Sequence, residues 1–121
     1  MNSPADRDQL LSELGRSDEV SITVTGRSSK KKRSTPVWFI VEGRKLQLVP
    51  VRGSETPWFR NLMKDPHILL SIGQTSVSSE ATLLRDQKGA EKVLDKLRVK
   101  YRRMWSESYY PKHDAYVEVP L

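Results

Sequence analysis

The residue types best suited to binding a small anion gather in one short segment, residues 25–36. It contains five cations, several hydroxyl side chains and one glycine, and no acid. A phosphate group is bound by several hydrogen-bond donors and positive charge at short range, and the guanidinium groups of Arg27 and Arg33 can each offer it two bonds. Hydroxyl side chains that could add hydrogen bonds are those of Ser29, Ser34 and Thr35. The segment therefore predicts a phosphate-binding hairpin.

Two other interpretations of this basic segment remain open on the residues alone. It could be a solvated hairpin tip, in which the lysines protect an exposed strand edge from pairing with other chains. It could also be a nonspecific nucleic-acid patch or a patch similar to a nuclear-localisation signal. A run of lysine and arginine is a weak motif, so its position in the fold has to decide between these interpretations.

A second candidate anion site lies where a predicted strand runs into a predicted helix. The first amides of a helix have no partner within it and mark the positive end of its dipole. A preceding arginine would add a cation, and a tryptophan in the helix would offer a flat apolar surface to a ring. The candidate residues are Val51, Arg52, Gly53, Ser54 and Trp58. In the structural alternative Trp58 belongs to the core and Ser54 only caps the helix.

The C-terminal part of the chain is rich in aromatic residues that have polar tips. They are Tyr101, Trp105, Tyr109, Tyr110 and Tyr116. Such side chains are common at the rims of ligand pockets and at protein interfaces, although they could equally pack a C-terminal helix onto the core. Trp105, Tyr109 and Tyr110 are the candidates for a pocket or a dimer interface.

No arrangement of side chains in the sequence would itself carry out catalysis. No Ser-His-Asp pattern, P-loop or GxGxxG motif is visible, and the acids show no pairing typical of acid–base catalysis. The chain has no cysteine, which excludes disulfides, thiol nucleophiles and thiolate metal sites within it. Its two histidines, His67 and His113, lie far apart, so a metal site has little support. Any reaction would therefore belong to a bound cofactor.

Hydrophobic periodicity and turn residues predict the elements that must position these groups. A short helix should follow a cap at Ser3 and end near Gly15. Strands are expected at residues 19–25, 34–42, 46–51, 68–72, 77–85 and 115–121, and further helices at residues 58–64 and 88–105. The first three strands should form a meander. The fold class is mainly β (α+β), a small barrel of about six antiparallel strands with a short and a long helix.

The composition sets the class of protein and of partner. A chain of 121 residues suits one domain, and its net charge of +6 suggests an anionic partner such as nucleic acid, a phosphorylated cofactor or an acidic lipid surface. The mean hydropathy of −0.60 and the lack of a long apolar run argue against a membrane span. Residues 1–16 lack the apolar region of a secretory signal, so a cytoplasmic location is expected.

Two motifs in order resemble those of a known family. Residues 25–36 read TGRSSKKKRSTP, which resembles the TGRxSGxxRxTP pattern of the split β-barrel flavin and deazaflavin proteins. Residues 57–66 read PWFRNLMKDP, which is similar to the family pattern PxWxxNLxxxP. This family includes pyridoxamine 5'-phosphate oxidase and deazaflavin-dependent nitroreductases and quinone reductases. The chain departs from the pattern at Lys30, where the family has glycine, and at Lys32, where it has proline.

The resemblance implies a homodimer of split β-barrels that binds FMN or the deazaflavin coenzyme F420. It implies that a first group of residues approaches the phosphate or side chain of the cofactor: Arg27, Ser29, Arg33, Ser34, Thr35 and Pro36. Residues 51–54 would lie near the ring or the phosphate, Trp58 matches a family helix position, and Trp105 is a candidate, with Tyr109 and Tyr110, for the aromatic residue near the ring. Residues 19–121 would form the barrel and residues 1–18 an N-terminal helical segment.

The activity implied by the resemblance is that of an oxidoreductase. Its reduced cofactor would pass a hydride to a small electron acceptor such as a quinone or a nitro compound. The alternative is a non-catalytic module on the same barrel, which binds a flavin, haem or nucleic acid, although the two motifs make nucleic acid the less favoured partner.

Overall fold

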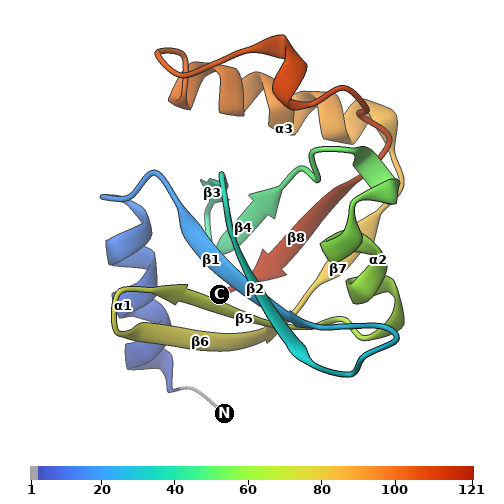
Figure 1. Cartoon of the computed structure of the whole chain (residues 1–121). Coiled ribbons are helices and arrows are strands. Elements are labelled where there is room, and N and C mark those ends of the chain that lie inside the picture. Colours follow the sequence, from blue (N-terminus) through green and yellow to red (C-terminus); the bar gives the residue numbers. More distant parts are fainter. Residues whose placement is uncertain (1–2) are drawn as a thin grey trace.

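The computed structural model describes residues 3–121, which form two four-stranded antiparallel sheets and three α-helices (Figure 1). One sheet has the strand order β2-β1-β5-β6 and the other β3-β4-β8-β7. The elements in chain order are α1 (Pro4–Leu14), β1 (Val20–Thr25), β2 (Lys32–Val37), β3 (Ile40–Glu42), β4 (Lys45–Leu48), the 3-10 helix η1 (Gly53–Glu55), α2 (Pro57–Lys64), β5 (His67–Ile72), β6 (Thr75–Glu80), β7 (Thr82–Leu84), α3 (Gln87–Lys100), the 3-10 helix η2 (Glu107–Tyr109) and β8 (Tyr116–Pro120). This is the predicted split β-barrel class, and its two sheets do not close into one cylinder.

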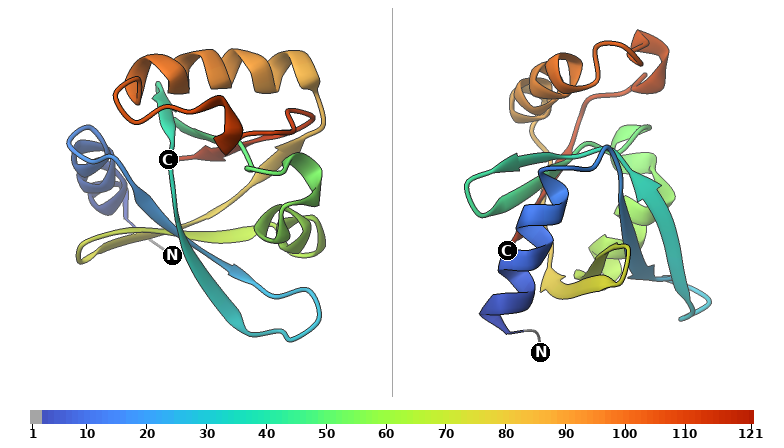
Figure 2. Two further views of the ribbon diagram at one scale, coloured as in Figure 1. Left: turned by 45° about the horizontal axis from the view of Figure 1, so that its top comes forward. Right: turned by 90° about the vertical axis from the view of Figure 1, so that its left-hand side faces the viewer.

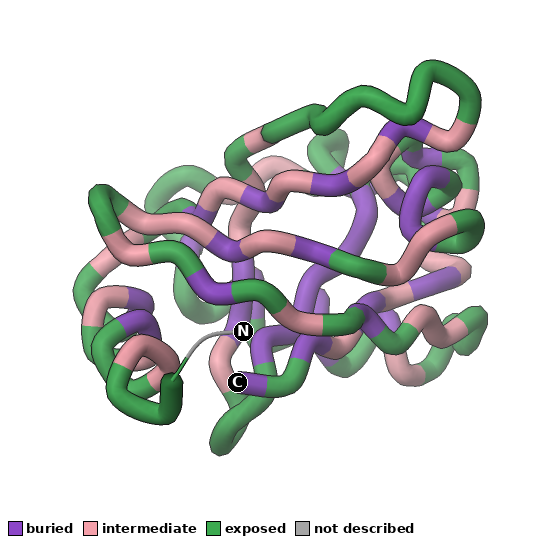
Figure 3. Tube along the Cα trace, turned by 90° about the horizontal axis from the view of Figure 1, so that it is seen from below, coloured by how far each residue is buried: buried purple, intermediate pink, exposed green. Residues whose placement is uncertain are grey.

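Alternation of apolar and polar residues places the strands around the core. Along β1, Val20, Ile22 and Val24 are buried while the residues between them are only partly buried, as the sequence predicted. β1 pairs with β2 on one side and with β5 on the other. In Figure 3 buried positions recur along the strands, whereas the turns between them are exposed. β1 therefore lies in the interior of its sheet and holds the β2 hairpin against the core.

The predicted strand over residues 34–42 is divided between the two sheets, so the predicted three-strand meander is wrong. β2 pairs with β1, whereas β3 pairs with β4 in the other sheet. The division falls at Phe39, whose N–H donates to the Tyr101 hydroxyl at 3.1 Å and whose carbonyl accepts from Lys100 Nζ at 3.0 Å. Side chains at the C-terminal end of α3 thus provide hydrogen-bond partners for the N–H and the carbonyl of Phe39. The chain can therefore leave one sheet and enter the other here without leaving these backbone groups unpaired.

The predicted strand over residues 77–85 is divided in the same way. β6 pairs with β5, and β7 pairs with β8 in the other sheet. Between them the N–H of Ala81 donates to the carbonyl of Pro66 at 2.9 Å. These two divisions explain why residues 3–121 contain eight short strands where periodicity predicted about six.

The long helix ends earlier than predicted. α3 stops at Lys100 instead of residue 105, and Tyr101 follows it as the C-terminal cap. The buried face of the helix consists of Ala90, Val93, Leu94 and Leu97, as its spacing predicted. Beyond the helix the Tyr101 ring stacks on Trp38 with ring centroids 4.4 Å apart, while Met104 is exposed. The chain then returns across the barrel to β8, carrying Trp105 and the following tyrosines with it.

The N-terminal helix is attached to the barrel core. Ser3 and Asp6 form a capping box that begins α1, and Gly15 follows its end. Leu10 and Leu14 are fully buried in the same cluster as the strands. Figure 2 shows α1 and α3 on different sides of the sheets, with the turn between β1 and β2 projecting away from α3. No helix in residues 3–121 is long and apolar enough to cross a membrane.

Candidate functional site

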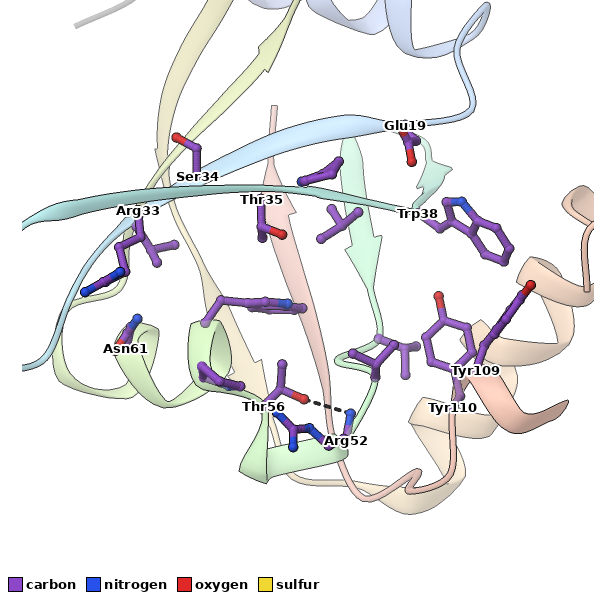
Figure 4. A pocket seen from close by; sticks show the side chains of 17 residues that line it. Glu19, Arg33, Ser34, Thr35, Trp38, Arg52, Thr56, Asn61, Tyr109 and Tyr110 are labelled. Atoms are coloured by element: carbon purple, nitrogen blue, oxygen red, sulfur yellow. Dashed lines mark hydrogen bonds between the residues drawn. The ribbon is translucent and has the colours of Figure 1, made fainter. Parts of the chain in front are cut away.

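A cavity of about 650 Å³ opens between the β2 strand, the α2 helix and the segment before β8 (Figure 4). Its volume lies in the range of small-molecule and cofactor pockets. The walls come from five parts of the sequence that the two sheets bring together: β1 with the residue before it, β2 and its continuation to Trp38, the residues after β4, α2 with the residue before it, and the tyrosines at residues 109–110. The cavity has a basic end, an apolar floor and an aromatic end.

Arg33 defines the basic end. It follows the turn of the β1–β2 hairpin, it is exposed, and its guanidinium has no hydrogen bond or ion pair with any residue from 3 to 121. The hydroxyl of Ser34, the next residue, forms a hydrogen bond of 2.7 Å with the hydroxyl of Thr23. Thr35 and Pro36 continue the β2 wall of the cavity. A guanidinium without a carboxylate partner at the mouth of a cavity is suited to an anionic ligand.

Arg27 and Ser29 shape the turn and do not line the cavity. The Arg27 side chain donates to Asn61 Oδ1 at 2.7 Å, and its backbone N–H donates to the same oxygen at 3.1 Å. Ser29 Oγ accepts from the N–H of Lys31 at 3.2 Å. Asn61 is a buried residue on α2 that also lines the cavity. Arg27 therefore fastens the basic turn to α2.

The floor of the cavity is apolar and centres on Trp58. This residue lies in the first turn of α2, is half-buried and packs against the main core. Val49 and Val51 from the end of β4 and Pro36 and Val37 from β2 complete the floor. Such a surface fits one face of a planar ring system.

The second arginine, Arg52, stands across the cavity from β2. Its backbone N–H donates to the Thr56 hydroxyl at 2.8 Å, which fixes the loop before α2. Its guanidinium, like that of Arg33, makes no hydrogen bond or ion pair within the part of the chain that the structure describes. Arg33 and Arg52 thus present two cations to one cavity.

Gly53 and Ser54, which the sequence placed at an anion site, contact a side chain of the protein itself. Ser54 donates through its backbone N–H to Asp114 Oδ1 at 2.8 Å and through its hydroxyl to Oδ2 at 2.6 Å. Partial burial alone would raise the pKa of Asp114, but the Ser54 bonds and the Lys112 ammonium hold it below its usual value. Ser54 is not the helix cap either, because α2 begins with Thr56 in the cap position.

The aromatic end is built from side chains that lie far apart in the sequence. Trp38 meets the edge of Tyr109 with ring centroids 5.6 Å apart, and Tyr110 lies beside them. Burial raises the pKa of Tyr110 from 10.0 to about 12, so its hydroxyl keeps the proton even in mildly alkaline solution. Trp105 does not line the cavity but stacks on Tyr110 from behind at 5.4 Å. Tyr109 is half-exposed and could contact a second small molecule in the cavity.

The structure brings a subset of the predicted site residues to one cavity. These are Arg33, Ser34, Thr35, Pro36, Val51, Arg52 and Trp58. The other predicted residues, Arg27, Ser29, Gly53, Ser54 and Trp105, lie behind the walls of this cavity. Sequence reasoning missed Trp38 and Thr56 as lining residues, and no local pattern could have revealed Trp38, which occupied the middle of a presumed continuous strand.

The donor set of the cavity suits binding and orientation of a ring-bearing anion. Two unpaired arginines and several hydroxyls can hold an anionic group, and the apolar floor can hold a ring. No group of three His, Cys, Asp or Glu side chains within the described residues could hold a metal ion. The cavity has one carboxylate, that of Glu19, at its aromatic end. The side chains described here therefore offer no acid–base pair and no nucleophile activated by a base.

Comparison with known structures confirms the fold. A candidate pyridoxamine 5'-phosphate oxidase from Listeria innocua superposes with a TM-score of 0.68 at 15% identity, over 93% of this chain and 90% of that one. An F420-H2 dependent reductase, FDR-A, superposes with a TM-score of 0.60 at 20% identity, over 84% and 93%. A protein described as a domain-swapped dimer gives 0.62 at 21% identity, over 97% and 99%. At these identities the likeness concerns the fold.

Sequence comparison assigns the family. No curated protein sequence matches the chain. The family model of the F420H(2)-dependent quinone reductases matches residues 8–119, which include both arginines, the apolar floor and the aromatic end of the cavity. This agrees with the resemblance of the two motifs at residues 25–36 and 57–66. The chain belongs to the F420H(2)-dependent quinone reductase family.

Proposed function

We propose that this protein is an F420-dependent oxidoreductase that reduces a quinone or a similar small electrophile. The observation that carries the proposal is the cavity, in which two unpaired arginines flank an apolar floor large enough for a ring. Membership of the F420H(2)-dependent quinone reductases favours the deazaflavin over FMN. The similar fold of pyridoxamine 5'-phosphate oxidase-like proteins keeps FMN as the alternative cofactor.

The cofactor fits the cavity in one general orientation. Arg33 and Arg52 would hold the phosphate or the acidic side chain, since both line the cavity and neither guanidinium has a partner among the described residues. Thr35 would add a hydroxyl bond, Ser34 would support β2 from its other face through its bond with Thr23, and Trp58 would lie against the ring. When bound, reduced F420 supplies a hydride, which together with a proton from solvent converts a quinone into a hydroquinone.

The aromatic end would receive the electron acceptor. Trp38 and Tyr109 offer ring faces and edges to a planar acceptor, and the Tyr110 hydroxyl, protonated at neutral pH, could donate a hydrogen bond to an acceptor oxygen. Together these residues would exclude water from the reacting atoms and fix the acceptor against the ring. The roles of Arg27, Ser29, Gly53, Ser54 and Trp105 at the cofactor stay predictions of the sequence.

We further propose that the protein acts as a homodimer in the cytoplasm. A protein of the same fold described as a domain-swapped dimer supports the homodimer. Equilibrium sedimentation over a range of concentrations would test it, and a monomer at every concentration would refute it. The cytoplasmic location stays an expectation from the sequence.

The experiment that tests the cofactor is a fluorescence titration of the purified protein with F420 and, separately, with FMN. We expect F420 to bind with a Kd below about 100 µM, roughly −5.5 kcal/mol, and more tightly than FMN. Stopped-flow oxidation of reduced F420 by a short-chain quinone should then depend on the protein. Failure of both cofactors to bind would refute the proposal, and F420 binding without turnover would favour the non-catalytic alternative.

Arg33→Ala with Lys31→Ala as its matched control tests the proposed site. Both changes remove one cation from the same hairpin, but only Arg33 lines the cavity. Loss of a charge-assisted hydrogen bond should cost about 1.5–3 kcal/mol of F420 affinity for Arg33→Ala, and Lys31→Ala should cost much less. Equal small effects would return the basic segment to the interpretation of a solvated hairpin tip.

A further inference from the structure

Two walls of the cavity come from segments that are distant in sequence. Val51 and Arg52 stand on the loop that follows β4, and Tyr109 and Tyr110 stand on the segment between α3 and β8. Neither segment is a strand of the two sheets. These two walls are therefore held together by contacts between the two loops and not by the ladder of either sheet.

The Asp114 carboxylate supplies that contact. It accepts both the backbone N–H and the hydroxyl of Ser54, at 2.8 and 2.6 Å, so each carboxylate oxygen has one bond to the loop after Arg52. Gly53 has a φ of +57°, and a β-carbon there would overlap Asp114 Oδ1. Glycine is therefore required both by the backbone conformation and by the close approach of the carboxylate.

Further contacts reinforce the same junction. Lys112 Nζ lies 2.9 Å from Glu55 Oε2 and 3.8 Å from Asp114 Oδ2, so the ammonium bridges the two segments a second time. A parallel β-bridge joins Arg52 and Lys112. We use the name Asp114 junction for these contacts of Gly53, Ser54, Glu55, Lys112 and Asp114.

The Asp114 junction is connected to the tyrosine wall through a short chain of contacts. His113 Nε2 hydrogen-bonds to the carbonyl of Tyr110, so the backbone just before Asp114 is tied to the tyrosine. Tyr110 in turn stacks on Trp105. A displacement at Asp114 would therefore move Tyr110 relative to Arg52, which changes the width of the cavity.

We propose that Asp114 is a positioning residue, which holds the tyrosine wall of the cavity against the Arg52 wall and so keeps the cavity formed before a ligand binds. The choice of F420 as the ligand rests on the proposed function, whereas the fixing of the two walls does not. A cavity formed in advance binds its ligand more tightly because fewer groups lose freedom on binding.

The test compares four variants of the whole chain. Asp114→Ala removes the junction, Asp114→Asn keeps its shape without its charge, and Ser54→Ala removes one of the two bonds to the carboxylate. The control is Asp8→Ala, which removes an exposed carboxylate on α1 paired with Arg44 at 3.0 Å, outside the cavity lining and away from residues 105–113. Hydrogen exchange of the protein without ligand and fluorescence titration with F420 are measured for each.

The expected result is local loosening with weaker binding. In Asp114→Ala the amides of residues 105–113 should exchange at least about tenfold faster, while the amides of β1 and β5 keep their protection. The Kd for F420 should rise about tenfold, and Asp114→Asn and Ser54→Ala should fall between wild type and Asp114→Ala. Asp8→Ala should leave both measurements at their wild-type values.

Two results would overturn the proposal. The first is exchange at residues 105–113 that equals the control in both Asp114→Ala and Ser54→Ala. The second is a uniform gain in exchange across all strands, which would make Asp114 a general stabiliser of the fold. If wild-type protein does not bind F420, the proposed function fails, and the exchange measurement alone still decides whether Asp114 fixes the two walls.

Discussion

Lys30 is a residue whose backbone conformation does not suit its side chain. Its φ of +61° lies in the left-handed region, which costs a residue with a β-carbon about 1 kcal/mol relative to glycine. The backbone bond from its N–H to the carbonyl of Gly26, at 3.0 Å, holds it there. The family pattern that this segment resembles has glycine at this position, and glycine adopts this conformation without the strain.

Lys30→Gly should therefore be tolerated better than the same change one residue later. Glycine raises the entropy of the unfolded chain at both positions, but only at Lys30 does it also remove strain. We expect Lys30→Gly to be about 1 kcal/mol more stable to urea than Lys31→Gly. Equal stability of the two variants would show that the turn stores no strain at Lys30.

The raised pKa of Tyr101 should make the free energy of unfolding depend on pH in the alkaline range. Burial raises its pKa from 10.0 to about 12, while its hydroxyl bonds the backbone of Asp18 and Phe39. Below pH 10 the folded and unfolded states both hold the proton, so this group adds no slope. Between pH 10 and about 12 the unfolded state loses the proton first, and stability falls as the pH rises.

Tyr101→Phe separates the hydroxyl from the ring. We expect it to cost about 1–3 kcal/mol near neutral pH, because the buried N–H of Phe39 loses its partner. Its urea-unfolding free energy should also fall less steeply than that of wild type between pH 10 and 12, so the two curves should converge. Parallel curves would mean that Tyr101 titrates at the same pH in both states.

At the residue scale, the sequence predicted those site residues whose role can be inferred from a short motif around them. Arg33 and Trp58 belong to two short motifs whose residue types already indicate an anion and a ring. Asp114 was not predictable, because its role depends on Ser54, sixty positions earlier, and a lone aspartate carries no pattern. Trp38 was missed for a related reason, since its contact with Tyr109 arises only when the segment after α3 folds back to the end of β2.

At the scale of elements the strand faces were predictable and the strand ends were not. The alternation of β1 and the helical spacing of α3 are properties of the segments themselves, and both appear in the structure. The transfers between sheets at Phe39 and Ala81 depend on distant partners, namely Tyr101, Lys100 and Pro66. Apolar residues continue through both transfers, so periodicity alone joined two strands into one.

The packing of α3 on β8 gives a prediction at this scale. Gly89 lies in the first turn of α3, and a β-carbon there would lie 2.9 Å from Tyr116 Cζ and closer still to Cε1. Gly89→Ala should therefore destabilise by about 1–3 kcal/mol through overpacking, even though alanine favours a helix by about 1 kcal/mol. Thermal unfolding followed by circular dichroism would measure it.

Removal of the Tyr116 ring should reverse the sign of that effect. In a Tyr116→Ala background the overlap with the ring is gone, and the close contact that remains is with Asp86 Oδ2 at 3.0 Å, on an exposed side chain that can move. Gly89→Ala should then stabilise by up to about 1 kcal/mol through helix propensity. If Gly89→Ala destabilises both backgrounds equally, the glycine is needed for the backbone of α3 and not for the close approach of Tyr116.

At the scale of the whole molecule, the sequence predicted the class and the structure supplies the connections. Composition and spacing indicated one domain with mainly antiparallel strands, and both sheets are antiparallel. The sequence also suggested that residues 1–18 form a segment distinct from the barrel over residues 19–121. The contacts of α1 favour one unit that includes both α1 and the barrel, since the Arg7 side chain donates to the carbonyls of Ser78 and Pro120, one in each sheet.

The burial of α1 leads to a prediction about cooperativity. Leu10 is fully buried in the main core, whereas Leu11 beside it is only partly buried. Leu10→Ala should lower the free energy of unfolding by about 2–5 kcal/mol, as expected for a cavity in a close-packed core, and Leu11→Ala should lower it clearly less.

Because α1 would unfold together with both sheets, circular dichroism and tryptophan fluorescence should report the same midpoint for each variant. The three tryptophans all lie outside α1, so their fluorescence follows the rest of the barrel. A Leu10→Ala protein whose tryptophan signal keeps the wild-type midpoint would make the N-terminal helix a separate unit, which the barrel does not need in order to fold.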